Sequence, residues 1–201
     1  GDTLAIAVPA DAAIENGRVA FYNAGTLAFE GQAVVGVLPD MVTFVPGRDV
    51  LLVANEGEQE RDDDDLIVSD APGSVTVIDL STGTAAPAVY DLGFSGFDAR
   101  EEELRQKGIR IPALAGTFFS AGTGSITVGS DIEPEYIAAA PDGSVAFVTL
   151  QENNAFGIID LPADPSLASL VGFAPLGLKD FSRGRPSLST FTLPVSERPV
   201  L

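Results

Sequence analysis

Acidic side chains lie next to short apolar runs in two parts of the sequence, and their carboxylates could bind a cation. Glu56 and Glu58 follow one such run, and Glu133 and Glu135 precede another. The chain has no histidine and no cysteine, so the commonest transition-metal ligands and the usual general base are missing. Oxygen ligands alone favour a hard cation, of which Ca²⁺ is the simplest. The candidate metal ligands are Asp40, Glu56, Glu58, Glu133, Glu135 and Asp180.

The overall charge argues against one class of partner. The 201 residues include 29 acidic and 11 basic side chains, which gives a net charge of −18. Nucleic acid is therefore a poor partner, because phosphates must be neutralised by clustered Lys and Arg. Cations and cationic partners suit this composition better. No membrane span is expected either, since the apolar runs are far shorter than the ~20 residues that cross a bilayer.

An internal repeat is the main guide to the fold. Residues 39–53 match residues 134–148 without a gap. Residues 73–80 then match residues 154–161, after the first copy has gained an acidic insertion at about residues 58–71. Each copy consists of short β-rich runs separated by Pro, Gly, Asn or Asp, which is typical of antiparallel strands joined by tight turns. A repeat of this kind predicts stacked supersecondary units.

Several of these runs are apolar on both faces, so both faces must be covered. Residues 50–54 and 75–80 are examples, and residues 17–23 give a partial third copy. Blades stacked on neighbouring blades cover both faces of a sheet. The sequence therefore predicts an all-β chain of about three to four β-propeller blades in an incomplete ring, with one short inserted helix. The expected divisions are a partial blade 1–37, a blade 38–96, a helical and loop insertion 97–130, a blade 131–178 and a tail 179–201.

The inserted helix is predicted between the blades. Asp98 is the expected N-cap with Glu101 three residues on, and Gly108 is the expected end. The Gly, Ser and Thr-rich residues 112–129 that follow are interpreted as a loop or an outer strand.

Strand direction predicts where the acidic residues gather. The first two strands of a blade are antiparallel, so the loop before the first and the loop after the second share one rim. The loops before the first strands hold Asp40, Glu135 and Asp180, and the loops after the second strands hold Glu56 and Glu152. Converging carboxylates raise one another's pKa or bind a cation. The alternative is that these are solvated turn residues, as expected for the acidic run 62–65.

Several segments resemble the exported bacterial propeller proteins of the choice-of-anchor I family, some of which are called alkaline phosphatases; phytase-like propellers are more distant. The resemblance covers most of residues 4–182. The segments that carry it are Leu38–Met41, Val53–Glu58, Asp131–Ala138, Val148–Ala155 and Leu176–Asp180. It implies an extracellular, cell-surface or periplasmic protein that carries calcium. A first residue other than Met fits a processed chain or an excised fragment.

Two functions are consistent with these features. One is a noncatalytic structural or binding module within a larger assembly. The other is a calcium-dependent phosphoesterase acting on a phosphate-ester ligand, with Glu135 and Lys179 as catalytic candidates; a surface ion pair is the simpler role for Lys179. Family members are longer and form complete rings, so an open array of blades would expose an apolar face. We therefore expect self-association, or other chains that complete the ring.

Overall fold

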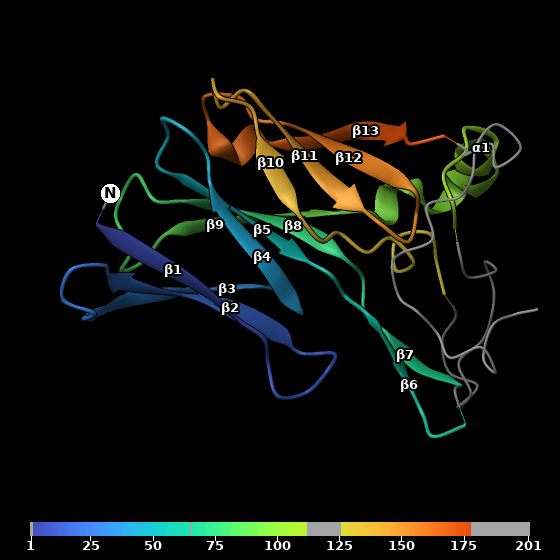
Figure 1. Cartoon of the computed structure of the whole chain (residues 1–201), viewed down its shortest axis with the longest axis horizontal. Helices are drawn as coiled ribbons and strands as arrows, with labels where there is room; N and C mark the ends of the chain where they lie inside the picture. The colour runs from blue at the N-terminus through green and yellow to red at the C-terminus, as the bar shows by residue number, and fades with distance from the viewer. Residues whose placement is uncertain (1, 65, 112–125, 178–201) are drawn as a thin grey trace, which may run out of the picture.

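The computed structural model describes residues 2–64, 66–111 and 126–177, and its main elements are three antiparallel sheets (Figure 1). The predicted all-β class, with propeller-like blades and a short inserted helix, is confirmed. The first sheet contains β1 (Thr3–Val8), β2 (Asn16–Asn23) and β3 (Phe29–Val37). The second contains β4 (Pro39–Phe44), β5 (Val50–Asn55), β8 (Ser74–Asp79) and β9 (Ala88–Gly93). The third contains β10 (Ile137–Ala139), β11 (Val145–Leu150), β12 (Ala155–Asp160) and β13 (Ser169–Pro175).

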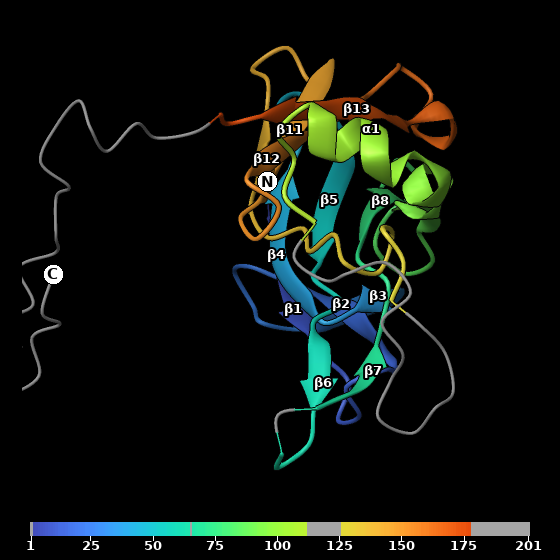
Figure 2. The same ribbon diagram turned by 90° about the vertical axis from the view of Figure 1, so that its right-hand side faces the viewer.

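The matched segments of the repeat are corresponding strands. β5 and β11 are the second strands of their sheets, and β8 and β12 are the third strands. The acidic insertion of the first copy contains a separate hairpin of β6 (Gln59–Arg61) and β7 (Ile67–Asp70). Figure 2 shows this hairpin extending away from the three sheets. The insertion therefore leaves the order of the four main strands unchanged.

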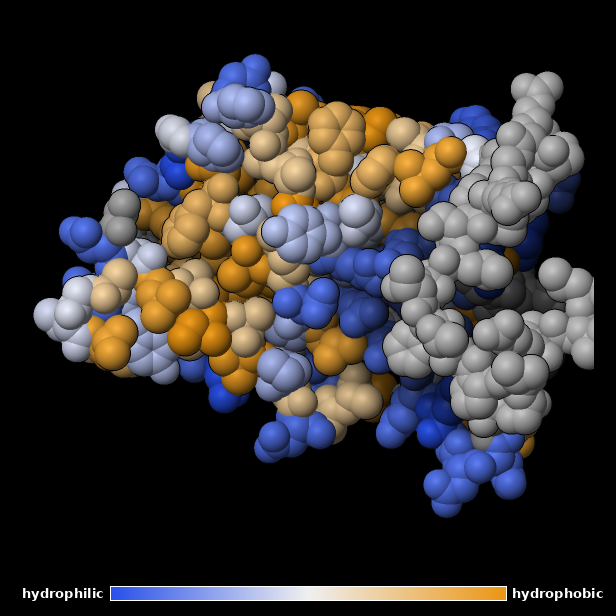
Figure 3. Space-filling view, viewed as in Figure 1, coloured by the Kyte–Doolittle hydropathy of each residue, from blue (hydrophilic) through white to orange (hydrophobic). Residues whose placement is uncertain are grey.

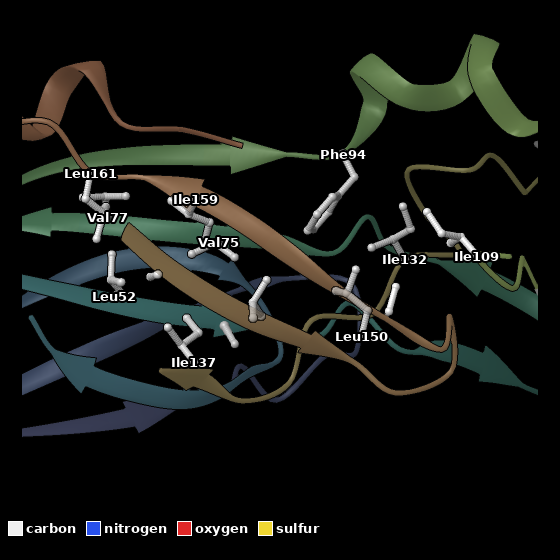
Figure 4. Packing of buried hydrophobic residues seen from close by; sticks show 14 of the residues in the cluster. Leu52, Val75, Val77, Phe94, Ile109, Ile132, Ile137, Leu150, Ile159 and Leu161 are labelled. Carbon is white, nitrogen blue, oxygen red and sulfur yellow. The ribbon is translucent and has the colours of Figure 1, made fainter. Parts of the chain in front are cut away.

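The core lies between the sheets, as the apolar runs predicted. Every residue of β5 is buried. Leu51 and Val53 join a cluster with Phe21 of the first sheet, whereas Leu52 joins a cluster with Ile137 of the third sheet (Figure 4). The second sheet is thus covered on both faces by its neighbours, which is the packing of stacked blades.

The helix forms near its predicted position, but the predicted N-cap is wrong. A 3₁₀ helix covers Ser95–Arg100 and leads directly into α1 (Glu101–Gln106), so Asp98 lies inside a helical turn. Its Oδ1 accepts a hydrogen bond from the backbone N–H of Gly129 at 2.7 Å. Gly108, with φ of 90°, follows the helix as expected. None of the helices in the described parts of the chain could span a bilayer.

One arginine links the second and third sheets. The guanidinium of Arg48, in the β4–β5 turn, donates hydrogen bonds to the carbonyls of Gly143, Leu161, Pro162 and Ala163. The distances from its nitrogens to these oxygens run from 2.6 to 3.2 Å. Hydrogen bonds from a charged donor are stronger than neutral ones, so this contact holds the two sheets in a fixed relation.

Candidate functional site

The loops before the first strands and after the second strands meet at one end of the sheets. In the second sheet, the backbone N–H of Glu56 donates to the carbonyl of Leu38 at 2.9 Å. In the third sheet, the N–H of Glu135 donates to the carbonyl of Thr149 at 3.0 Å. The two sheets share the antiparallel pairing that brings these loops together. The repeat therefore places its acidic residues at equivalent ends of neighbouring sheets.

Eight acidic residues gather there, and their charges contribute to raising the pKa of Glu56, Glu133 and Glu135; we call these eight residues the acidic rim. They come from both four-stranded sheets and from the β6–β7 hairpin. The acidic rim consists of Asp40, Glu56, Glu58, Asp70, Asp131, Glu133, Glu135 and Glu152. In Figure 3, hydrophilic surface borders the apolar sheets on the side from which the hairpin extends.

The environment favours the neutral form of three rim glutamates. Burial raises the pKa of Glu56 to about 7, with further contributions from the charges of neighbouring acids. Burial raises the pKa of Glu133 to about 8, and the charge of Glu152 makes the next largest contribution to this increase. The pKa of Glu135 is also raised, first by burial and then by Glu152 and Asp40. These carboxylates lie in a site where negative charge is costly.

Asp70, which the sequence reasoning did not select, belongs to the same site. It ends β7, and its Oδ2 accepts a hydrogen bond from the hydroxyl of Ser130 at 2.7 Å. Burial raises its pKa to about 6, although the Ser130 bond acts in the opposite direction. Its position close before Gly73, where the repeat resumes, is the sequence signal that could have identified it. Asp62, Asp63 and Asp64, by contrast, are exposed, as expected for the acidic run.

Asn153 holds the rim loops of the third sheet in place. Its side chain is completely buried. The Nδ2 group donates to the carbonyls of Arg110 at 3.1 Å and Asp131 at 2.9 Å, and Oδ1 accepts from the N–H of Glu133 at 3.4 Å. One amide therefore joins three segments and positions Asp131 and Glu133.

The rim offers oxygen ligands that lack partners. Asp70 Oδ1 and Glu152 Oε2 are buried and have no hydrogen-bond donor. A buried carboxylate oxygen without a donor is unfavourable, and a cation is one way to satisfy it. In the part of the chain that the structure describes, no three acidic side chains already form a metal-binding group. The chemistry of the donors thus fits a hard cation, although a finished set of ligands is not formed.

The predicted site residues are only partly covered by the structure. Asp40, Glu56, Glu58, Glu133 and Glu135 all lie in the acidic rim, with Asp40 and Glu58 exposed. Asp180 and Lys179 lie outside the described residues. Residues 112–125 of the predicted loop or outer strand are also outside them, and residues 126–129 form no strand.

Almost the whole chain shows a family relationship. The model of the choice-of-anchor I domain matches residues 1–198. The chain belongs to the choice-of-anchor I family. A comparison with curated proteins finds no match.

One solved structure supports the fold of this choice-of-anchor I domain. Hydrazine synthase from Kuenenia stuttgartiensis shares 17% sequence identity with a TM-score of 0.53, over 89% of this chain and 48% of that protein. This likeness supports the β-propeller fold. A functionally unknown protein from Desulfotomaculum acetoxidans shares 14% identity with a TM-score of 0.48, over 88% of this chain and 39% of that one. The choice-of-anchor I domain therefore spans less than half the length of either protein.

Proposed function

We propose that this domain is a calcium-binding β-propeller module that acts outside the cytoplasm as a structural or binding part of a larger assembly. The observation that carries the proposal is the pair of buried, unpartnered carboxylate oxygens on Asp70 and Glu152. Beside them, Glu56 and Glu133 have pKa values raised to about 7 and about 8. A divalent cation would satisfy the oxygens and offset the repulsion.

The rim residues have distinct expected roles. Glu56, Glu133, Glu152 and Asp70 would hold the ion, because their carboxyls are the partly buried ones that share negative potential. The more exposed Asp40, Glu58 and Glu135 would add attraction for cations, with Asp180 as a further predicted ligand. Ca²⁺ takes six to eight oxygens and accepts backbone carbonyls and waters among them. When bound, it supplies the positive charge that ties the hairpin and the two sheets together.

Calcium titration by isothermal calorimetry tests this proposal. We expect saturable binding that weakens by about tenfold or more in Glu133→Gln, which keeps the side chain's shape and removes its charge. Glu15→Gln is the matched control, because Glu15 is an exposed glutamate outside the rim. Its affinity should equal that of the unmodified chain. The calcium site would be rejected if titration of the unmodified chain gave no heat of binding and if calcium did not change its unfolding temperature.

The phosphoesterase alternative stays a prediction. Glu135 lies in the rim, whereas Lys179 lies outside the described residues. The calcium-loaded samples can be assayed on a chromogenic phosphate ester. Hydrolysis that disappears in Glu135→Gln would favour the enzyme, and its absence with calcium bound would favour the module.

The two outer sheets support the proposal that further blades complete the ring. Leu4 and Ile6 alternate along β1 and are each 41% exposed. On the third sheet, Phe147 points away from the buried face and is 42% exposed. Tyr136, which immediately precedes β10, is 63% exposed. Figure 3 shows apolar residues over both regions. Inside the molecule, equivalent faces are covered by a neighbouring sheet, so these two would be covered by blades of another copy or another chain.

Replacing Phe147 by Asp should disrupt that association. A charge buried between two sheets is costly, so we expect the unmodified chain to associate at tens of micromolar and Phe147→Asp to sediment as a monomer. Analytical ultracentrifugation measures this directly. Leu167→Asp changes an apolar side chain that is 65% exposed on a 3₁₀ turn instead of a sheet face, and should associate normally. A monomeric unmodified chain would rule out self-association and leave other chains as the partner.

A further inference from the structure

A cavity lies where β3 packs against β8 and β9, and none of its lining residues belongs to the acidic rim. Its volume is about 420 Å³, which is within the range of small-molecule sites. Apolar side chains form most of its wall, including Val35, Val37, Val89 and Phe94. Asp91 is the charged residue among the described residues that line it. The cavity thus combines an apolar wall with a single carboxylate.

A chain of buried polar groups fixes that carboxylate. Asp91 Oδ1 accepts hydrogen bonds from the hydroxyls of Ser74 at 2.8 Å and Thr76 at 3.1 Å. Those hydroxyls accept in turn from Asn55 Nδ2, at 3.1 and 2.8 Å. Asn55 and Thr76 are fully buried, and Ser74 is 5% exposed. Three buried polar residues therefore orient one exposed side chain. A carboxylate that is solvated only by water does not need such a buried network.

The network also holds an unused acceptor. Asn55 Oδ1 is buried and has no hydrogen-bond donor. Asn55 lies directly behind the cavity wall, because a Cβ added to Gly36 would be 2.7 Å from Asn55 Cγ and 2.6 Å from Ser74 Oγ. Leaving a buried amide oxygen unpaired costs on the order of 1–3 kcal/mol. The network beside the cavity therefore has one acceptor that no described residue satisfies.

The charge and geometry define the ligand class. In the described part of the chain no cationic residue lines the cavity, and Asp91 has no ion-pair partner. Because Oδ1 already accepts two hydrogen bonds, the carboxylate is poorly disposed for the two-pronged contact of a guanidinium. A compact ammonium fits better. We propose that this cavity binds a primary ammonium group on a short apolar stem, with the charge at Asp91 and the stem along Val35 and Val89.

Titration with n-butylammonium chloride, followed by amide chemical shifts, tests the site. We expect saturable shifts at Gly36, Gly73 and Gly93, which line the cavity. Affinity should fall by about tenfold or more in Asp91→Asn, which keeps the side chain's shape. Asp160→Asn, an exposed residue of β12, should bind as the unmodified chain does. An N-acetylated Gly-Lys-Gly peptide, whose only primary ammonium is the lysine side chain, is added in parallel to test whether a protein side chain binds as the free amine does.

A second variant guards against a folding defect. Val89→Trp adds bulk at the cavity wall and leaves Asp91, Ser74, Thr76 and Asn55 unchanged, so it should also abolish the shifts. Butan-1-ol, which has the same stem and no charge, should bind at least about tenfold more weakly. Unsaturable shifts, equal affinity in Asp91→Asn, or equal binding of the alcohol would each overturn the proposal.

Discussion

Replacing Asn153 by Ala should unfold the domain at a clearly lower temperature and weaken calcium binding. The substitution removes the donors to the carbonyls of Arg110 and Asp131 and the acceptor of the Glu133 N–H. Buried groups left without partners cost about 1–3 kcal/mol each, so we expect a total loss on the order of 3 kcal/mol. For a domain of this size that corresponds to a midpoint lower by roughly 6–12 °C. Differential scanning calorimetry measures it.

The calcium effect follows from the same contacts. Asn153 orients the loop that carries Glu133, and residues that position metal ligands typically contribute 10-fold to 100-fold to affinity. We therefore expect calcium binding to weaken by about tenfold in a variant that still folds below its midpoint. Asn153→Asp separates the two roles, because its carboxylate can accept from the Glu133 N–H but cannot donate to the carbonyls.

A neighbouring asparagine gives the matched control. Asn154 has a positive φ of 53°, and its side chain donates to the Gly177 carbonyl at a more exposed position. Glycine adopts positive φ without strain, so Asn154→Gly should change stability by less than about 1 kcal/mol. Equal losses in the two variants, or a neutral Asn153→Ala, would show that the buried amide does not organise the rim.

The strand arrangement was predictable because the chain repeats itself. A gapless match between two segments requires the same pairing in both, so β5 with β11 and β8 with β12 could be aligned from sequence. Antiparallel direction then predicted that Glu56 and Glu135 would lie at equivalent ends. The repeat thus allowed residues that are distant in sequence to be assigned to the same end of the sheets, and most of the rim residues could be predicted in this way.

Features that depend on the folding of insertions were not predictable. Asp70 reaches the rim only because the β6–β7 hairpin returns its last residue to Ser130. Asp98 matched the local pattern of an N-cap, but the chain starts a 3₁₀ helix at Ser95 and uses Asp98 to bind Gly129. Asn153 has no local sequence signal that sets it apart from other polar loop residues, since burial of its amide depends on segments far away in sequence. In each case the deciding partner is remote along the chain.

Raising the pH should destabilise the calcium-free domain, and calcium should reverse this. The folded-state pKa values of Glu56, Glu133 and Asp70 are about 7, about 8 and about 6, against ordinary values of 4.5 for Glu and 3.8 for Asp. Between these limits the folded state holds more protons than the unfolded state, so unfolding free energy falls as pH rises. The stabilisation is complete below the ordinary values and lost as pH passes through the raised ones.

Thermal unfolding at about pH 5.5 and about pH 8.5, with and without calcium, measures this linkage. Without calcium the midpoint should be several degrees lower at the higher pH. Glu133→Gln should reduce that difference, because glutamine has no charge to bury, whereas Glu15→Gln should leave it unchanged. Calcium competes with protons for the same oxygens, so its stabilising effect should be larger at the higher pH. A calcium-free midpoint that stays constant or rises between the two pH values would mean that the rim carboxyls are well solvated. The site would then have no excess negative charge for a cation to neutralise.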